Sequence, residues 1–506
     1  MPKHVVLFNP RSADAKHRIP NSILQVGASI DGSFPYHFVD GNLEKDPLQT
    51  LLDTIEKHDV GYVGMTVMPG PQLSQAIPFT KKIHLQHPDI KIIWGGYFAA
   101  NQHKVVLESG WVDFVINGPG DAAFPELLKS LEKGDLEAIP SICNLIYLNE
   151  HGKIVSTKKE ALPDMDNLPE FPYKKLDANY PIENYLAKTF MGQKTLSYHS
   201  SFGCPFTCSF CAVVPIYNAR WKGLSADRMA KDVLDFKSKY AIDAVEFHDN
   251  NFFTSRKRVV DFAEKIKDAN IAWWGEGRID TINKYSDEDL ALMQKAGLKM
   301  IFLGAETGND EVLKQMDKGG TQTGAQIKEF AARLKRFGIV PEYSFVLGMP
   351  GDSPEKVMRQ INEDIRFIQE IKRINPNTEI IIYVYSPVPT EGSELYETIQ
   401  EQGFSFPQTL EDWLSPDWER FDLRKNPLTP WLNARHIKRI KNFETVLNGM
   451  YPTSSDFRIT KGKRRILKFA SYWRYKTGFF AFPYEIKLLL KMWKYRQPEE
   501  QGFYSE

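Results

Sequence analysis

Short apolar segments alternate with segments of helical spacing along most of the chain. In the first 150 residues, the apolar segments end in turns that contain glycine or proline. The expected strands are 4–9, 36–39, 60–67, 90–94 and 113–116, and the expected helices are 48–57, 75–85 and 122–131. This order predicts an open, parallel, Rossmann-like α/β sheet, which would bind ligands at the carboxyl ends of its strands.

The same alternation resumes after a break. The expected strands are 195–199, 244–248, 271–274, 300–303, 343–347 and 380–385, and the expected helices are 226–240, 257–269, 287–296, 323–337 and 354–374. Six strand–helix units predict a partial (β/α)6 barrel rather than the complete eightfold barrel. Strand ends and the loops after them carry the chemistry in such a fold.

Four regions follow from this division. An N-terminal α/β domain takes residues 1–150, and a linker rich in proline and without clear periodicity takes residues 151–190. The barrel takes residues 191–395. Residues 396–506 lose the alternation, and we expect a mostly helical C-terminal extension.

The composition mainly excludes certain classes of protein. The 506 residues include 64 basic and 64 acidic side chains, so the formal net charge is zero and no overall attraction to nucleic acid is expected. The sequence contains no apolar segment of about 18 residues and no export signal at its start. These features predict a cytoplasmic protein.

Three of the four cysteines follow the first barrel strand. Cys204, Cys208 and Cys211 have the spacing CxxxCxxC, which lets one loop place three thiolates around a [4Fe-4S] cluster and leaves one iron open to another ligand. Structural zinc would need a fourth ligand from a distant histidine or from Cys143. A redox pair of Cys208 and Cys211 would leave Cys204 unexplained.

This motif, with an aromatic residue at Phe210, resembles the signature of the radical S-adenosylmethionine (SAM) superfamily. The resemblance implies that a reduced cluster cleaves SAM to methionine and a 5′-deoxyadenosyl radical, which removes hydrogen from an unactivated carbon. It also implies that Phe210 packs near the SAM adenine, although simple packing within the loop would explain an aromatic residue equally well.

Turns after the later strands resemble other parts of the superfamily's SAM site. Asp249 and Asn250 stand where polar groups meet the SAM amine, and Arg278 stands where an arginine faces the carboxylate. Glu306 is placed near the ribose or the methionyl part, and Gly348 lies in a turn under the adenine. For Arg278 and Glu306, a structural salt bridge remains the alternative.

The N-terminal domain resembles the cobalamin-binding domain of the B12-dependent branch of this superfamily. The matching turns contain Gly95 and Gly96, then Gly118 and Gly120, where glycine lets the backbone approach a large flat ligand. The D-x-H-x-x-G motif is absent, so cobalamin would bind without a histidine ligand from the chain. A domain that has lost cobalamin or only docks substrate remains open. Methylthiotransferases carry three additional N-terminal cysteines, and this chain has only Cys143 there.

The resemblance implies methyl transfer through methylcobalamin to a small molecule, which could be lipid-like or macrocyclic. Flavodoxin or ferredoxin would supply the electron. One alternative is a cobalamin-dependent radical cyclisation or rearrangement of a hydrophobic or tetrapyrrole substrate. Another is a non-catalytic sensor that binds cobalamin or an iron–sulfur cluster.

The C-terminal region is basic and aromatic. Residues 458–496 contain twelve basic residues and one acidic residue, Glu485, with aromatic residues interleaved. After Pro483, lysines and apolar residues occupy different faces of an expected helix. The helix could pack on the barrel with its lysines reaching water, or it could touch the inner surface of a membrane. Nucleic-acid binding is not expected, because no known RNA-binding module accompanies the charge.

Overall fold

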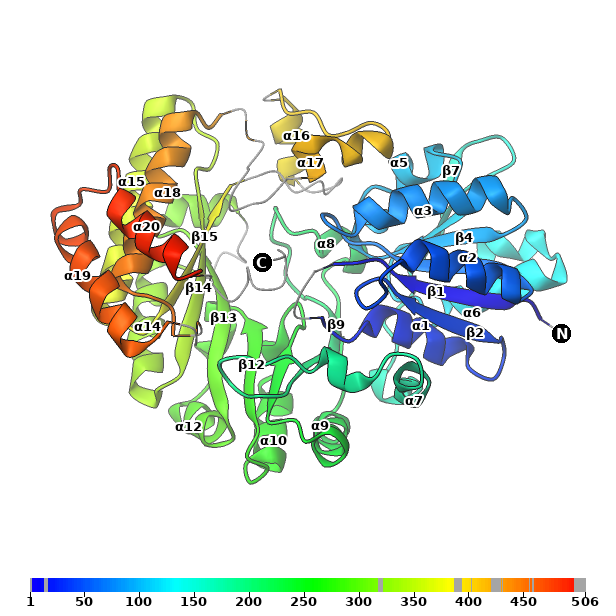
Figure 1. Ribbon diagram of the computed structural model, residues 1–506, viewed down its shortest axis with the longest axis horizontal. Helices are drawn as coiled ribbons and strands as arrows, with labels where there is room; N and C mark the ends of the chain where they lie inside the picture. Colours follow the sequence, from blue (N-terminus) through cyan, green and yellow to red (C-terminus); the bar gives the residue numbers. More distant parts are fainter. Residues whose placement is uncertain are drawn as a thin grey trace.

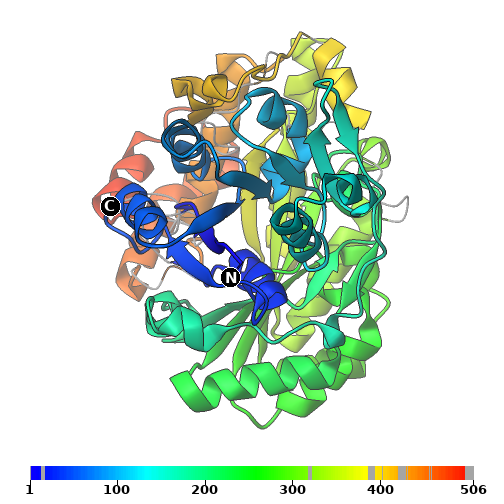
Figure 2. The same cartoon turned by 90° about the vertical axis from the view of Figure 1, so that its right-hand side faces the viewer.

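The structure is a computed structural model. It describes residues 2–12, 17–316, 322–385, 394–401, 403–419, 429, 431–454, 456 and 459–495. Two α/β bodies face each other across the cysteine loop, and the last helices cover the far side of the second body (Figure 1). Viewed from the side, the N-terminal domain lies in front of the barrel (Figure 2).

The N-terminal sheet has the strand order β2-β1-β3-β4-β5-β6-β7. Its strands are β1 (His4–Asn9), β2 (Tyr36–Asp40), β3 (Val60–Thr66), β4 (Lys91–Gly95), β5 (Phe114–Ile116), β6 (Leu145–Leu148) and β7 (Ile154–Ser156). The first five are parallel, as the sequence predicted, whereas β6 and β7 join antiparallel. These two strands were not predicted, because they have only four and three residues.

Helices cover both faces of this sheet. They are α1 (Asn21–Ile30), α2 (Pro47–Lys57), α3 (Leu73–Gln86), α4 (Tyr97–Asn101), α5 (His103–Glu108) and α6 (Ala123–Lys133). Helices α1 and α6 pack into one hydrophobic core, and α2 to α5 pack into the other. The predicted Rossmann-like arrangement is therefore confirmed.

The segment between the two bodies is irregular but firmly attached. It contains η2 (Met165–Asn167), α7 (Tyr173–Asp177) and η3 (Ile182–Tyr185). The Tyr185 hydroxyl donates to Asp40 over 2.6 Å, and the Tyr180 hydroxyl donates to Glu44 over 2.7 Å. Burial raises the pKa of Asp40, while its hydrogen bonds from Tyr185, Asn9 and Asn42 oppose that shift. These bonds fix the segment against the N-terminal domain.

The second body is the predicted six-stranded parallel sheet, in the order β15-β14-β13-β12-β11-β8. Its strands are β8 (Thr195–Tyr198), β11 (Ala244–Phe247), β12 (Ala272–Gly277), β13 (Leu298–Glu306), β14 (Val340–Leu347) and β15 (Glu379–Val384). The helices that cover it are α9 (Ala226–Tyr240), α10 (Arg256–Ile266), α12 (Asp287–Lys295), α14 (Gly324–Phe337) and α15 (Pro354–Ile374), with shorter α11 (Ile279–Ile282) and α13 (Asp310–Gln315). The sheet stays open between β8 and β15, which makes it a partial barrel.

The C-terminal extension is helical and divides into two groups. Its elements are α16 (Glu394–Glu401), η5 (Glu411–Leu414), α17 (Pro416–Glu419), α18 (Ala434–Met450), α19 (Lys461–Thr477) and α20 (Tyr484–Met492). Trp413 packs edge-on against Phe98 of the N-terminal domain, with 5.0 Å between ring centroids. Helix α18 packs on α15, and α19 and α20 pack on α18. Within the described residues, no helix is long and apolar enough to cross a membrane.

Candidate active site between the two domains

The cysteine loop is held at its base by a small hairpin. Strands β9 (Ser201–Gly203) and β10 (Trp221–Gly223) pair antiparallel and enclose the loop and the short helix α8 (Val214–Tyr217). The three cysteines are half-buried and form no disulfide, and the Cys211 amide donates to the Cys208 carbonyl over 3.0 Å. The hairpin therefore fixes both ends of the loop.

Gly203 is required at the start of this loop. Its φ is +71°, and a Cβ there would lie 2.2 Å from the Arg220 carbonyl oxygen. We expect Gly203→Ala to lower the melting temperature and to reduce iron loading at least several-fold, because backbone atoms must move. Gly152→Ala is the matched control: its φ is +70°, but a Cβ there meets nothing within 4 Å. Equal iron loading in the two variants would contradict this account.

The spread of the three sulfur atoms distinguishes between the possible metal sites. Around one zinc ion, sulfur ligands at about 2.3 Å from the metal would lie about 3.8 Å apart. Within the described part of the chain, the three cysteine sulfurs are not gathered within 4.8 Å of one another. Three thiolates on different irons of one cluster need the wider arrangement, so the loop fits a [4Fe-4S] cluster better than a single ion.

Arg278 carries a buried positive charge into this loop. One guanidinium nitrogen donates to the Cys208 sulfur over 3.1 Å, and two others donate to the Asp280 carboxylate over 3.0 and 2.7 Å. The guanidinium also stacks over the Phe206 ring at 3.9 Å. Burial raises the pKa of the Cys204 thiol, whereas Asn251 and the Arg278 charge lower it. The arginine thus favours the thiolate form that binds iron.

Asp249 lies beside the loop, but its carboxylate is bonded to neighbouring residues of the protein rather than open to a ligand. It is fully buried and accepts hydrogen bonds from the Ser200 amide at 2.9 Å, from the Ser200 hydroxyl at 3.0 Å and from the Ser201 hydroxyl. These bonds hold the turn between β8 and β9. The structure thus gives Asp249 a positioning role toward the cysteine loop.

Its neighbour Asn251 was not among the predicted site residues. The Asn251 amide nitrogen lies 3.9 Å from the Cys204 sulfur, and its carbonyl oxygen is buried without a hydrogen-bond partner. An orphaned acceptor beside the cysteines suits a ligand that donates a hydrogen bond, such as an amine. The signal in the sequence was its place in the same polar turn as Asp249 and Asn250.

Asn250 links the two domains. Its side-chain oxygen accepts a hydrogen bond from the Tyr97 hydroxyl over 2.8 Å. Tyr97 opens α4 directly after Gly96, and burial raises its pKa well above the ordinary value. Tyr97 therefore stays protonated and donates. The bond brings a carboxyl-terminal strand end of the N-terminal sheet to the barrel residues beside the cysteines.

We expect Tyr97→Phe to weaken this junction without unfolding the protein. Loss of the one hydroxyl leaves the Asn250 oxygen without its donor, at a cost of about 1–3 kcal/mol. Reductive SAM cleavage should fall less than fivefold, whereas cobalamin retention should fall further. Retained cobalt and 5′-deoxyadenosine formed are measured on the same samples. Equal fractional losses of the two would contradict the expectation.

Glu306 and Gly348 occupy unusual backbone conformations at neighbouring strand ends. Glu306 has a φ of +62°, and the pairing of β13 with β14 is irregular between Gly304 and Glu306. A non-glycine residue held there is strained, and such strain gathers at functional sites. Gly348 has a φ of +85°, and its carbonyl accepts from the Trp431 indole over 3.1 Å. The C-terminal extension thus covers the end of β14.

The predicted glycines of the N-terminal domain lie at the carboxyl ends of β4 and β5. Gly96 and Gly118 have φ values of +92° and +137°, and a Cβ at Gly96 would lie 2.7 Å from the Val67 carbonyl oxygen. The local backbone alone explains these two glycines. Gly95 and Gly120 have only negative or extended φ, so a close ligand remains a reason for them. Phe210, half-buried, packs against the same hydrophobic core as α4.

A polar group inside the barrel was missed by sequence reasoning. His248 lies 3.3 Å from the Glu246 carboxylate and 3.9 Å from the Glu276 carboxylate. The Trp274 indole donates to Glu342 over 2.9 Å. The available signal was the alternation of polar residues with Val245, Phe247 and Trp273, which face the outer helices.

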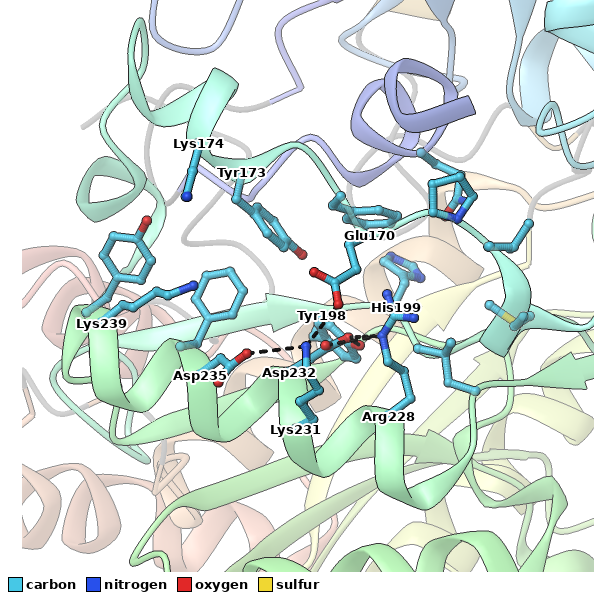
Figure 3. A pocket seen from close by; sticks show the side chains of 18 residues that line it. Glu170, Tyr173, Lys174, Tyr198, His199, Arg228, Lys231, Asp232, Asp235 and Lys239 are labelled. Atoms are coloured by element: carbon cyan, nitrogen blue, oxygen red, sulfur yellow. Dashed lines mark hydrogen bonds and ion pairs between the residues drawn. The ribbon is translucent and has the colours of Figure 1, made fainter. Parts of the chain in front are cut away.

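Figure 3 shows a separate cavity of about 280 Å³ between the linker and α9. Its charged side chains pair with one another: Lys231 with Glu170 at 2.9 Å, and Arg228 with Asp232 at 3.3 Å. The Tyr198 hydroxyl also donates to Asp232 over 2.7 Å. Because Tyr198 faces α9, this cavity lies on the helix side of β8 and belongs to the linker contact.

Three histidines form another group of side chains that could bind a metal ion. Rings of His4, His37 and His58 stack, and the closest nitrogen pair, His4 Nδ1 and His37 Nε2, is 2.9 Å apart. Burial and the charges of neighbouring residues, including Lys175 and Lys57, lower the pKa of His37 to about 4. The group lies at the amino ends of the strands, at the opposite edge of the sheet from Tyr97.

Comparison with known proteins identifies both bodies. A model described as Radical SAM superfamily matches residues 198–363, which include the cysteine loop and most of the barrel. Residues 198–363 are a radical SAM domain. A model described as B12 binding domain matches residues 20–128 of this radical SAM protein. The predicted family and its cofactors, a [4Fe-4S] cluster, SAM and cobalamin, are thus confirmed for the two domains.

The relatives of this radical SAM protein differ in activity. It is 27% identical to an uncharacterized methyltransferase of Pyrococcus horikoshii, over 70% of this chain and 76% of that protein. It is 26% identical to the anaerobic magnesium-protoporphyrin IX monomethyl ester cyclase of Rubrivivax gelatinosus, over 65% of this chain and 59% of that enzyme. The chain thus spans little more than half of the cyclase.

Solved structures share the fold. The cobalamin-dependent radical enzyme OxsB aligns with a TM-score of 0.70 at 15% identity, over 97% of this chain and 75% of OxsB. The methyltransferase TsrM from Kitasatospora setae aligns with a TM-score of 0.62 at 16% identity, over 79% of this chain and 78% of TsrM. The common architecture includes both domains and, for OxsB, the C-terminal region.

Proposed function

We propose that this protein transfers a methyl group from SAM, through cobalamin, to an unactivated carbon of a small molecule held between the two domains. The carrying observation is the Tyr97–Asn250 bond, which sets a strand end of the B12-binding domain beside the cysteine loop. When bound, the cluster with SAM supplies radical chemistry and cobalamin supplies a methyl carrier. The chain would bind and orient these groups and the substrate, and it would exclude water from them.

The site residues divide by cofactor. Cys204, Cys208 and Cys211 would hold the cluster, with the Arg278 guanidinium beside Cys208. The residues that would contact SAM are Asn250, Asn251, Arg278, Glu306, Gly348 and Phe210. Asp249 would act through Ser200 and Ser201 rather than by direct contact. The turns at Gly95, Gly96, Gly118 and Gly120 would face cobalamin.

The barrel interior favours a polar substrate over a lipid-like one. His248 lies 3.3 Å from the Glu246 carboxylate and 3.9 Å from the Glu276 carboxylate, and Glu342 accepts a hydrogen bond from the Trp274 indole there. An apolar substrate would displace water from these charged and polar side chains without offering them a hydrogen bond, which is costly. A substrate with amine or hydroxyl groups would meet them.

A radical cyclisation is the second candidate, because one of the relatives named above is a cyclase. Both reactions would use the same two cofactors. A non-catalytic sensor is disfavoured by the strained Glu306 and the orphaned Asn251 oxygen beside the cysteines, because a sensor has no need of a SAM site.

The transfer of the SAM methyl group separates these candidates without knowledge of the substrate. The protein is loaded anaerobically with iron, sulfide and hydroxocobalamin, then given reductant and SAM labelled on its methyl group. Methyl transfer predicts label that elutes with cobalamin. Formation of 5′-deoxyadenosine without labelled cobalamin would favour the cyclase, and neither product would favour the sensor.

A further inference from the structure

The last two helices present an unusual surface to solvent. Within the described residues, thirteen large hydrophobic side chains are exposed, and nine of them lie between Ile466 and Met492. Helices α19 and α20 form the outer end of the molecule, opposite the N-terminal domain (Figure 1). Monomeric proteins rarely gather so many exposed apolar side chains on one segment without a binding partner.

Basic and apolar residues make up most of the exposed face of α19. Phe469 is 85% exposed, and Ile466, Tyr472 and Trp473 are each about half exposed. At 100° per residue, Lys468 and Lys476 fall on the same face, with Arg465 between them. The opposite face packs inward through Leu467, Ser471 and Tyr475.

Helix α20 and the loop before it repeat this arrangement. Tyr484, Leu488 and Met492 form an exposed stripe, while Ile486 is buried. Lys487 and Lys491 flank the stripe on one side. The lysines lie on a different face from the buried apolar residues, as predicted. The helix also has a second apolar stripe, which is exposed. Packing on the rest of the protein therefore accounts for only one side of the helix.

The charge of the segment points to an anionic partner. Residues 461–494 contain ten basic residues and one acidic residue, Glu485. Glu485 pairs with Arg474, whose guanidinium is buried, so the one acidic charge of the segment is already balanced within it. Aromatic and aliphatic side chains interleaved with lysines match the interface of an anionic bilayer, where rings and alkyl chains enter the headgroup layer and lysines meet the phosphates.

We propose that α19, α20 and the loop between them form a docking surface for an anionic lipid bilayer. This surface binds the leaflet peripherally, with Phe469 and Leu488 inserting and Lys468, Lys476 and Lys491 contacting headgroups. Nucleic acid would also suit basic and aromatic residues, but it offers no partner for Ile466, Leu488 and Met492. The proposal does not depend on the reaction that the enzyme catalyses.

Sedimentation with vesicles tests the proposal on the full-length, cluster-loaded protein. We expect binding to vesicles of phosphatidylcholine with 30% phosphatidylglycerol to be at least about tenfold tighter than to pure phosphatidylcholine, and to weaken with salt. Equal binding to both vesicles, or binding to neither, would overturn the proposal. So would tighter binding to single-stranded RNA than to the anionic vesicles.

Two variants and a matched control localise the effect. Phe469→Ser with Leu488→Ser, and separately Lys468→Glu with Lys476→Glu, should each reduce binding about tenfold or more. Leu85→Ser removes from α3 a leucine that is 69% exposed, against 59% for Leu488, and should leave binding unchanged. Retained iron content and melting temperature show that the variants fold. Unchanged vesicle binding by both double variants would contradict the proposal. So would a protein that binds no vesicles but forms a dimer that Phe469→Ser converts to a monomer.

Discussion

Replacing Cys208 with alanine should abolish reductive SAM cleavage, with a loss of at least about 100-fold in 5′-deoxyadenosine formed. Cys208 is the cysteine that receives the Arg278 hydrogen bond, so the variant loses a cluster ligand and leaves a buried guanidinium without its sulfur partner. Iron bound per chain, measured after anaerobic loading and desalting, should fall in parallel.

Cys143→Ala provides the matched control. Cys143 is also half-buried and outside any disulfide, but it lies before β6 and away from the loop. Its removal should leave iron content and SAM cleavage within twofold of the unaltered protein. A Cys208→Ala protein that still binds a full complement of iron and cleaves SAM would contradict the assignment of the loop.

Replacing Arg258 with methionine should have the largest effect on stability. The Arg258 guanidinium is buried and donates to the carbonyls of Leu224, Phe252 and Ser200 over 2.7, 3.2 and 2.9 Å. Its charge also lowers the pKa of Asp249, which burial raises. Removing the guanidinium leaves three buried carbonyls without this donor and the buried Asp249 without a nearby positive charge, at a cost of about 3–5 kcal/mol.

Thermal unfolding of the cluster-free protein checks this estimate. We expect a melting temperature lower by roughly 6 °C or more, together with poorer iron loading, because Ser200 and Asp249 hold the start of the cysteine loop. Lys257→Met on the same helix removes a side chain that is 87% exposed and should change stability by less than about 0.5 kcal/mol. Similar melting temperatures for the two variants would show that Arg258 is not needed to balance Asp249.

Most of the fold followed from the sequence because its strands are buried and end in glycine or proline turns. The helices Ala226–Tyr240 and Pro354–Ile374 were predicted to the residue, since each begins after a serine that caps it and shows a strong apolar stripe. Strands β6 and β7 were missed, because three or four residues at a sheet edge carry little periodicity. Residues 317–321 and 386–393 lie outside the described part of the chain.

The candidate site was predictable only where spacing along the chain encodes it. The cysteine motif shows in one loop, whereas the Tyr97–Asn250 bond joins residues 153 positions apart. Asp249 shows a further limit: its place in the polar turn was read correctly, but only the structure shows that Ser200 and Ser201 occupy its carboxylate. Which side chain of a turn faces inward depends on tertiary packing.

Elemental analysis tests most directly whether one chain holds both cofactors. The protein is loaded anaerobically with iron, sulfide and hydroxocobalamin and then desalted. We expect about four iron atoms and about one cobalt atom per chain in the same sample. A protein that retains the iron but no cobalt would contradict the cobalamin half of the account, and one that retains neither would contradict the whole.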